Sequence, residues 1–216
     1  MDWLEFTAAF AAFFITHTIP LRPALRPRLQ RVLGRRGFAL AYSALSLAVM
    51  GWLIAAAGRA PYVPLWNWDP WQHLVPLVVM LPVCMILSLA IARPNPFSFG
   101  GARNEPFDPA RPGIVRVHRH PLLLALALWA AAHIVPNGDI AHVILFGIFA
   151  GFALVGHRLI DRRKRREMGR DWEVLAAKVK AAAPLPLPLP RIATGLALYL
   201  LLIVAHPLLF GVSPLL

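Results

Sequence analysis

The sequence is poor in cysteine and in acidic residues. Its one cysteine, Cys84, lies in an apolar run, so no disulfide can form within the chain, and we interpret Cys84 as a small buried apolar residue. Only 10 acidic residues stand against 22 lysines and arginines, which gives a net charge of +12. Such a charge indicates nucleic-acid binding where it gathers on a soluble face. Here the charges fall in short segments between apolar runs, so we expect no nucleic-acid partner.

Several catalytic signatures are also missing. The chain has no HExxH or CxxC spacing, no GxSxG and no glycine-rich phosphate loop. The sequence therefore gives no support for a zinc hydrolase, a serine hydrolase of the nucleophile-elbow type or a P-loop enzyme.

Long apolar runs are abundant instead, since 58% of the residues are hydrophobic. A bilayer-spanning helix needs roughly 20 apolar residues. Runs that approach this length cover residues 3–20, 38–58, 73–92, 120–136, 140–158 and 192–211. These runs predict an all-α polytopic membrane helix bundle with about six transmembrane helices. A cleaved signal peptide has a basic segment before its apolar run. The first run here has none, so we expect it to remain in the protein as a helix.

The basic residues predict how the helices are oriented. Of the 22 lysines and arginines, 21 lie in segments 21–37, 93–119 and 158–191, and the remaining one is Arg59. Basic residues are enriched in cytoplasmic loops. The sequence therefore predicts that these three segments are cytoplasmic and that both termini lie on the outer side.

One of the cytoplasmic segments predicts a surface helix. In the basic segment 161–183, Met168, Trp172, Leu175 and Val179 recur at helical spacing and form one apolar stripe. We interpret this segment as a basic amphipathic helix that lies on the inner membrane surface. The sequence PLPLPLP, residues 184–190, follows it and predicts an extended connector back to the membrane.

The eight histidines fall into two groups by depth. Helical rise places His17, His118, His120 and His157 near the cytoplasmic side, and His73, His133, His142 and His206 near the outer side. Ionisable side chains within membrane spans usually face the bundle interior and mark a functional site. Imidazole is also a common ligand of transition metals and of haem.

Four blocks of this sequence resemble the NnrU family of bacterial membrane proteins. They are THTIPLRPALRPRLQRVLGRRGFALAYSALSLA (16–48), PLWNWDPWQHLVPLVVMLP (64–82), GIVRVHRHPLLLALALWAAAHIVPNGD (113–139) and LFGIFAGFALVGHRLIDRRKRREMGRDW (145–172). The resemblance covers most of the chain. It implies a single integral domain over residues 1–216, a multi-pass protein of the bacterial inner membrane and periplasmic termini.

The resemblance also implies a cofactor. The family includes the 15-cis-zeta-carotene isomerase of plants and algae, a membrane enzyme that uses haem b with histidine ligands. Carried over to this sequence, the two iron ligands are His17 and His133, and the RHP histidine is His120. The resemblance implies haem-dependent cis–trans isomerisation of a polyene or, from the association of the family with nitrite and nitric oxide metabolism, a sensor or accessory role. The partners are then membrane lipid and either a hydrophobic polyene or nitric oxide; the oligomeric state is not predicted.

The depth of the histidines leaves a second ligand pair open. Helical rise places His17 and His133 about 11 Å apart in depth, which is too far for both to bind one iron in upright helices. His120 or His157 is then the partner of His17, and we take His120 as the alternative ligand. Arg119, which opens the same span, has a fork of N–H groups that can hold a carboxylate such as a haem propionate.

A wider resemblance suggests a different reaction. The RHP segment 119–121, the later EMGRDW at 167–172 and the proline-rich stretch after it are similar to the isoprenylcysteine and phospholipid methyltransferases of membranes. In that alternative, Arg119 and His120 bind S-adenosylmethionine.

Overall fold

The described residues of the computed structural model are 3–98, 104, 106–184 and 188–215. Helices dominate them, and apart from an isolated bridge between Pro64 and Asp139 these residues form no β-structure. The helices are α1 (Trp3–Thr18), α2 (Arg26–Arg59), α3 (Leu74–Ala90), α4 (Pro121–Ile134), α5 (Ile140–Met168), α6 (Arg170–Ala181) and α7 (Leu189–Phe210), with 3-10 turns η1 (Pro70–His73) and η2 (Gly113–Arg116). The chain divides into two compact units, Met1–Asn67 with Gly138–Leu145, and Trp68–Asn137 with Phe146–Leu216.

Four described helical segments are long and apolar enough to cross a membrane. They are α2, η1 together with α3, α5 and α7. Helices α1 and α4 are shorter, with 16 and 14 residues. The prediction of an all-α, multi-pass membrane protein is confirmed, whereas the count of six spans and the side on which the termini lie stay predictions.

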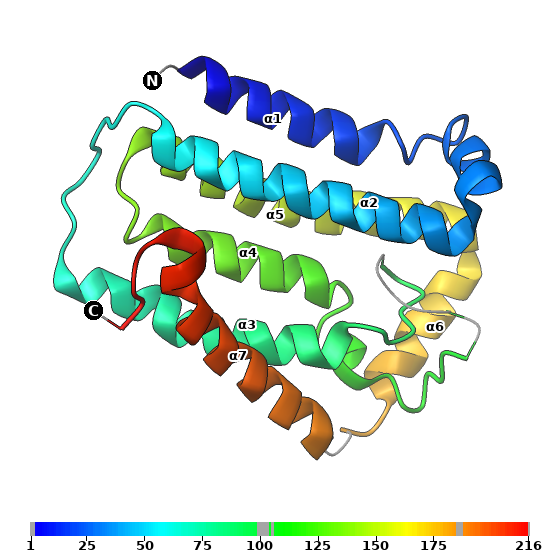
Figure 1. The fold of residues 1–216 in the computed structure, drawn as a ribbon. Helices are drawn as coiled ribbons and strands as arrows, with labels where there is room; N and C mark the ends of the chain where they lie inside the picture. Colours follow the sequence, from blue (N-terminus) through cyan, green and yellow to red (C-terminus); the bar gives the residue numbers. More distant parts are fainter. Residues whose placement is uncertain (1–2, 99–103, 105, 185–187, 216) are drawn as a thin grey trace. The chain divides into compact units, whose positions relative to one another are not determined.

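In the first unit, α1 packs along α2 (Figure 1). Glu5 of α1 accepts hydrogen bonds from Trp52 and Arg59 of α2. Arg59 is the one basic residue outside the three predicted cytoplasmic segments, and in the structure a carboxylate offsets its charge. Within α2, Gly34 has φ 71°, which separates a short basic helix from the longer apolar one.

In the second unit, α3 packs against both α4 and α7 (Figure 1). Helix α7 approaches α3 closely at Gly195, where a Cβ atom would lie 2.8 Å from the Met85 sulfur. Arg191 of α7 donates to the carbonyls of Ser88 and Ile91 and so satisfies backbone acceptors at the C-terminal end of α3. These contacts hold the end of α3 from which the loop that carries the candidate site continues.

The predicted apolar stripe is present, but its surroundings differ from the prediction. Helix α5 continues to Met168, and α6 begins after Gly169, which has φ 58°. Trp172 and Val179 of α6 are buried against Phe97 and Val115 of the loop before α4. The apolar stripe of α6 therefore packs against a loop of the protein, whereas the sequence predicted that it lies on the membrane surface. Both the stripe and the loop bury apolar side chains in this contact. Of the predicted extended connector 184–190, residues 185–187 lie outside the described residues.

The NGD tripeptide, residues 137–139, shapes a tight turn in the first unit. The carbonyl of Gly138 accepts from the backbone N–H of Leu65, and the backbone N–H of Ile140 donates to Val63. A Cβ atom on Gly138 would lie 2.6 Å from the carbonyl oxygen of Trp66 and equally close to its indole ring. The turn therefore has room for glycine only.

Replacing Gly138 with alanine should lower the free energy of unfolding by about 2–3 kcal/mol, because backbone as well as ring atoms would have to move. The measurement is the unfolding midpoint of the purified protein in detergent. Gly58→Ala is the matched control, since a Cβ there meets no atom within 4 Å. Equal midpoints for the two variants would contradict this account of the turn.

A topology reporter tests the predicted orientation. Because 21 of the 22 basic residues lie in three alternating segments, a reporter fused after Leu216 should read as periplasmic. A second fusion in segment 158–168 should read as cytoplasmic. A cytoplasmic signal from the first fusion would refute the six-span topology.

Candidate functional site

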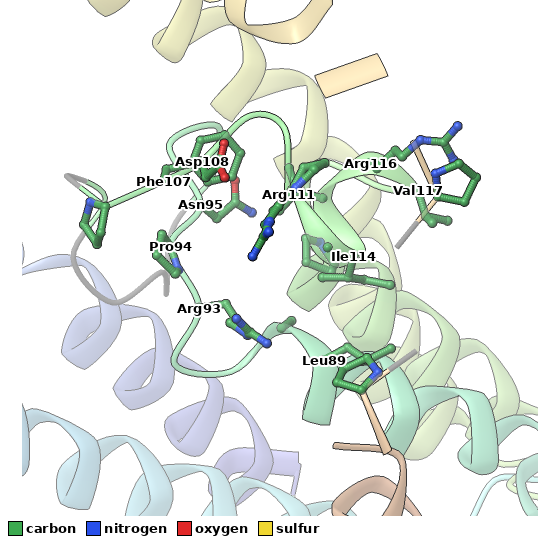
Figure 2. A pocket seen from close by; sticks show the side chains of 18 residues that line it. Leu89, Arg93, Pro94, Asn95, Phe107, Asp108, Arg111, Ile114, Arg116 and Val117 are labelled. Atoms are coloured by element: carbon green, nitrogen blue, oxygen red, sulfur yellow. The ribbon is translucent and has the colours of Figure 1, made fainter. Parts of the chain in front are cut away.

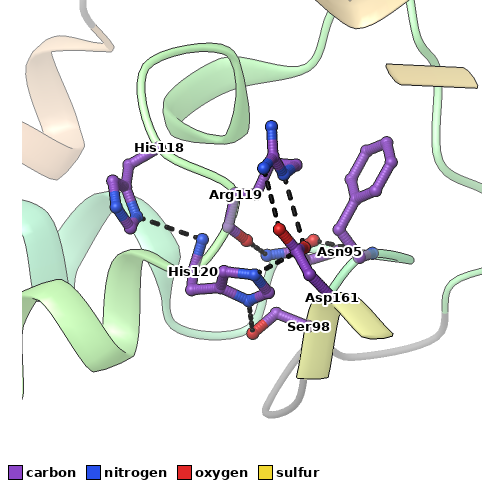
Figure 3. Close-up of polar contacts among 7 residues, drawn as sticks. Asn95, Ser98, His118, Arg119, His120 and Asp161 are labelled. Atoms are coloured by element: carbon purple, nitrogen blue, oxygen red, sulfur yellow. Dashed lines mark hydrogen bonds and ion pairs between the residues drawn. The ribbon is translucent and has the colours of Figure 1, made fainter. Parts of the chain in front are cut away.

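Polar side chains gather where the loop before α4 meets α5, within the second unit (Figure 3). We call this group the RHP cluster, after its central residues. Its members are Asn95, Ser98, His118, Arg119, His120, His157 and Asp161. Local sequence explains the position of its centre. Pro121 is the first residue of α4, so His120 is the N-cap residue directly before the helix.

His120 is the buried centre of the RHP cluster, with 3% of its surface exposed. Its Nε2 lies 2.9 Å from Oδ1 of Asp161, and its Nδ1 lies 3.0 Å from Oγ of Ser98. An ionised carboxylate can only accept, so Nε2 carries a proton and donates to Asp161. Both ring nitrogens of His120 therefore have partners within the protein.

Arg119 binds the same carboxylate from another side. Its Nη2 donates to Oδ2 of Asp161 over 2.8 Å, while its Nε lies 3.5 Å from Oδ1. The guanidinium also lies over the ring of Trp172, 5.3 Å from its centroid. The sequence predicts a carboxylate partner for Arg119, and in the structure that carboxylate is Asp161 of the chain itself. The role of Arg119 toward a haem propionate stays a prediction.

Backbone bonds hold the loops of the cluster. The buried Asn95 donates from Nδ2 to the carbonyl of Arg119 over 2.8 Å and accepts from the N–H of Phe97. The backbone N–H of His120 donates to Nδ1 of His118 over 3.1 Å. Burial lowers the pKa of the His118 imidazole, and the neighbouring His120 and Arg119 lower it further. His118 thus keeps the lone pair on Nδ1 that the backbone N–H requires.

His157 brings a third imidazole to this place. Its ring centroid lies 4.8 Å from that of His118 and 5.4 Å from that of His120. Its Nε2 is buried and has no hydrogen-bond partner among the described residues. A cavity of about 190 Å³ lies beside the three rings and is also lined by Arg116, Arg119 and Asp161. Of the four histidines predicted near the cytoplasmic side, the structure brings His118, His120 and His157 together. His17 belongs to the first unit, so its place in that group stays a prediction.

The geometry limits what the RHP cluster can do. Ser98, His120 and Asp161 follow one another by hydrogen bonds as in a nucleophilic triad. Among the described residues, however, Ser98 is buried and does not line this cavity. Among the residues that the structure describes, no group of three or more histidine, cysteine and acidic side chains is arranged to hold a metal ion. The cluster is therefore best described as a clamp that ties α4 to α5.

The two predicted haem ligands lie elsewhere in the chain. His17 is in the last turn of α1 and His133 is in the last turn of α4. In each, Nδ1 bonds the backbone carbonyl four residues earlier, Phe13 over 2.8 Å and Trp129 over 2.7 Å. A backbone carbonyl accepts only, so Nδ1 carries the proton and Nε2 keeps its lone pair. His17 belongs to the first unit and His133 to the second, so their pairing stays a prediction.

A comparison with known protein families decides the membership of the chain. The model of the family described as NnrU protein matches residues 5–214. The chain belongs to the NnrU family. No curated protein and no solved structure matches it.

In this NnrU chain, sequence reasoning missed three partners of Arg119 and His120. Asp161, Ser98 and Asn95 were not among the candidate residues, although they hold His120 and Arg119 in place. One signal for Asp161 was available, because it is the single acid among the basic residues 158–166 and lies at the end of an apolar run. No comparable signal exists for Ser98 or Asn95, which lie in a loop without periodicity.

Proposed function

We propose that this NnrU-family protein is a haem b protein of the bacterial inner membrane, with Nε2 of His17 and Nε2 of His133 as the iron ligands. The observation that supports the proposal is the state of these two rings. Each donates its Nδ1–H to a helix carbonyl, and among the described residues its Nε2 has no hydrogen-bond partner, which is the usual arrangement of metal-ligating histidines.

The surroundings of both rings also fit a flat, apolar cofactor. The ring of His17 stacks on Phe13 at 4.0 Å between centroids, and the ring of His133 lies 5.5 Å from Trp129 and 5.4 Å from Phe146. Aromatic side chains bind flat π-systems by stacking and edge contacts. Both histidines are partly buried, so each has one open side.

Two uses of such a haem agree with the family. A haem iron can exchange an electron with a conjugated polyene or bind nitric oxide. In the first case the protein is a cis–trans isomerase, and its own residues orient the polyene and exclude water. In the second case it is a sensor or accessory factor in nitrite and nitric oxide metabolism.

The test begins with the intact protein, purified in detergent after expression with added haem precursor. We expect a Soret band and about one haem b per chain, measured as the pyridine haemochrome. The holoprotein is then given a cis-polyene, with product isomers separated by chromatography, and in parallel nitric oxide, with the spectrum recorded. Protein that shows no Soret band even after incubation with haemin refutes the proposal.

The methyltransferase alternative remains the second candidate. It requires Arg119 and His120 to bind S-adenosylmethionine, yet in the structure both side chains bind Asp161. For this reason we place it after the haem proposal. Binding of S-adenosylmethionine by protein that holds no haem, measured by calorimetry, would reverse this order.

A further inference from the structure

A second cavity lies beside the RHP cluster, within the second unit (Figure 2). Its volume is about 480 Å³, within the range of roughly 300–1,000 Å³ that is usual for small-molecule sites. Its walls come from the C-terminal end of α3, the loop before α4 and η2. Neither the proposed haem ligands nor the RHP cluster's histidines line it, so what it binds is independent of the proposed function.

The charged side chains of this cavity are three arginines and one aspartate, Arg93, Arg111, Arg116 and Asp108. Figure 2 shows Arg93 and Arg111 extending into the same space. Within the described part of the chain, Arg93 and Arg111 have no hydrogen-bond or ion-pair partner on their side chains. Asp108 is partly engaged, since its Oδ1 accepts from the N–H of Ala110. The cavity therefore has an excess of positive charge with free N–H donors.

The arginines are attached to backbone that local bonds hold in place. The N–H of Arg111 donates to the carbonyl of Asp108, and the N–H of Arg93 donates to the carbonyl of Ala90. The side chain of Arg116 is fixed by its Nε, which donates to the carbonyl of Ala182 over 2.7 Å. An anion that binds Arg93 and Arg111 therefore has to order their side chains but not their backbone.

Apart from Asn95, the rest of the lining is apolar. Leu89, Phe107, Ile114 and Val115 contribute side chains, together with several prolines. A site with guanidinium forks and apolar walls suits an anion that carries an apolar part. Phosphate is the anion that matches several guanidinium forks at once.

The predicted orientation adds a reason for this choice. Segments 93–119 and 158–191 are predicted to be cytoplasmic, so the cavity would lie at the inner membrane surface. Basic pockets at that level bind the head groups of anionic lipids. We propose that this cavity binds a phosphate group through Arg93 and Arg111, with Arg116 adding charge, and that the apolar walls cover an attached apolar chain where the phosphate carries one. The phosphate can belong to an anionic membrane lipid or to a free phosphorylated compound.

The experiment measures lipid binding to the full-length protein in a neutral detergent by native mass spectrometry. The probes are phosphatidylglycerol and phosphatidylcholine of the same acyl chains. We expect tighter binding of phosphatidylglycerol, and Arg93→Gln and Arg111→Gln should each weaken it about tenfold, as expected for the loss of one charged hydrogen-bonded contact. Neither substitution removes a contact within the described part of the protein, so both variants should keep the unfolding midpoint of the wild type without lipid.

Arg162→Gln is the matched control, because Arg162 is exposed on α5 in the same basic region and does not line the cavity. It should leave binding unchanged. If Arg162→Gln weakens lipid binding as much as Arg111→Gln does, the binding is general charge attraction and the proposal is wrong. The proposal is also wrong if the two lipids bind equally and glycerol 3-phosphate has no effect.

Glycerol 3-phosphate distinguishes the two sources of phosphate. If millimolar glycerol 3-phosphate raises the unfolding midpoint of the wild type but not of Arg111→Gln, the site takes a free phosphorylated compound. If only phosphatidylglycerol responds to the substitutions, the site takes a lipid head group. Both outcomes support the phosphate site.

Discussion

Replacing His17 or His133 with alanine should abolish or shift the Soret band of the haem-loaded protein. Each substitution removes the Nε2 atom that the proposal assigns to the iron. If these two histidines hold haem, loss of either would change the absorption spectrum even where haem stays bound. The measurement is the absorption spectrum of oxidised and reduced protein, with haem content per chain.

His206→Ala is the comparison for this experiment, because the proposal does not include His206 although its Nδ1 also bonds a backbone carbonyl, that of Val212. Its spectrum should match that of the wild type. His120→Ala tests the alternative ligand pair that depth suggests. Because both nitrogens of His120 have protein partners, we expect a loss of stability and an unchanged Soret band. A normal spectrum for His133→Ala with an altered one for His120→Ala would make His120 the second ligand.

Replacing Asp161 with alanine should lower the free energy of unfolding by about 2–4 kcal/mol. Asp161 is the shared acceptor of Arg119 and His120, so its loss leaves the buried His120 Nε2 without a partner. The estimate stays below that for a fully buried pair because 43% of the Arg119 side chain is exposed, and solvent screens its charge. The measurement is the unfolding midpoint in detergent.

Asp171→Ala is the matched control for Asp161→Ala. Asp171 is an exposed acid in the first turn of α6, where its interaction with the helix dipole is worth about 0.3–1 kcal/mol. Asp161→Ala should therefore lower the midpoint several times more than Asp171→Ala. A similar effect of both would mean that the RHP cluster does not clamp α4 to α5.

Much of the helical framework was predictable from the sequence. Helices that cross a bilayer need long apolar runs, and the loops on its cytoplasmic side are rich in basic residues. The runs 73–92 and 192–211 became α3 (Leu74–Ala90) and α7 (Leu189–Phe210) with small shifts. The partner of the stripe on α6 was not predictable. A pattern of apolar residues predicts which face is buried and not what covers it, and here Phe97 and Val115 of a loop cover Trp172.

The candidate site shows the same limit. Charge and helical rise predicted that His17, His118, His120 and His157 lie near one side of the membrane, and the structure brings the last three together. The side-chain partners of His120, which are Ser98 and Asp161, lie 22 and 41 residues away from it along the chain. Such partners depend on tertiary packing, for which a single sequence offers no periodic signal.

The shortness of α4 has a consequence for the surrounding lipid. Its 14 residues cover about 21 Å, against a hydrocarbon core of about 30 Å. His120 precedes this helix, and Asn137 follows it and donates to the carbonyl of His133. The helix is thus about 9 Å shorter than the hydrocarbon core, and polar groups stand at both of its ends. If α4 crosses the membrane, as the six-span prediction requires, the bilayer must thin near its ends or water must enter below the head groups, and a thicker membrane should then bind this part of the protein less favourably than a thin one.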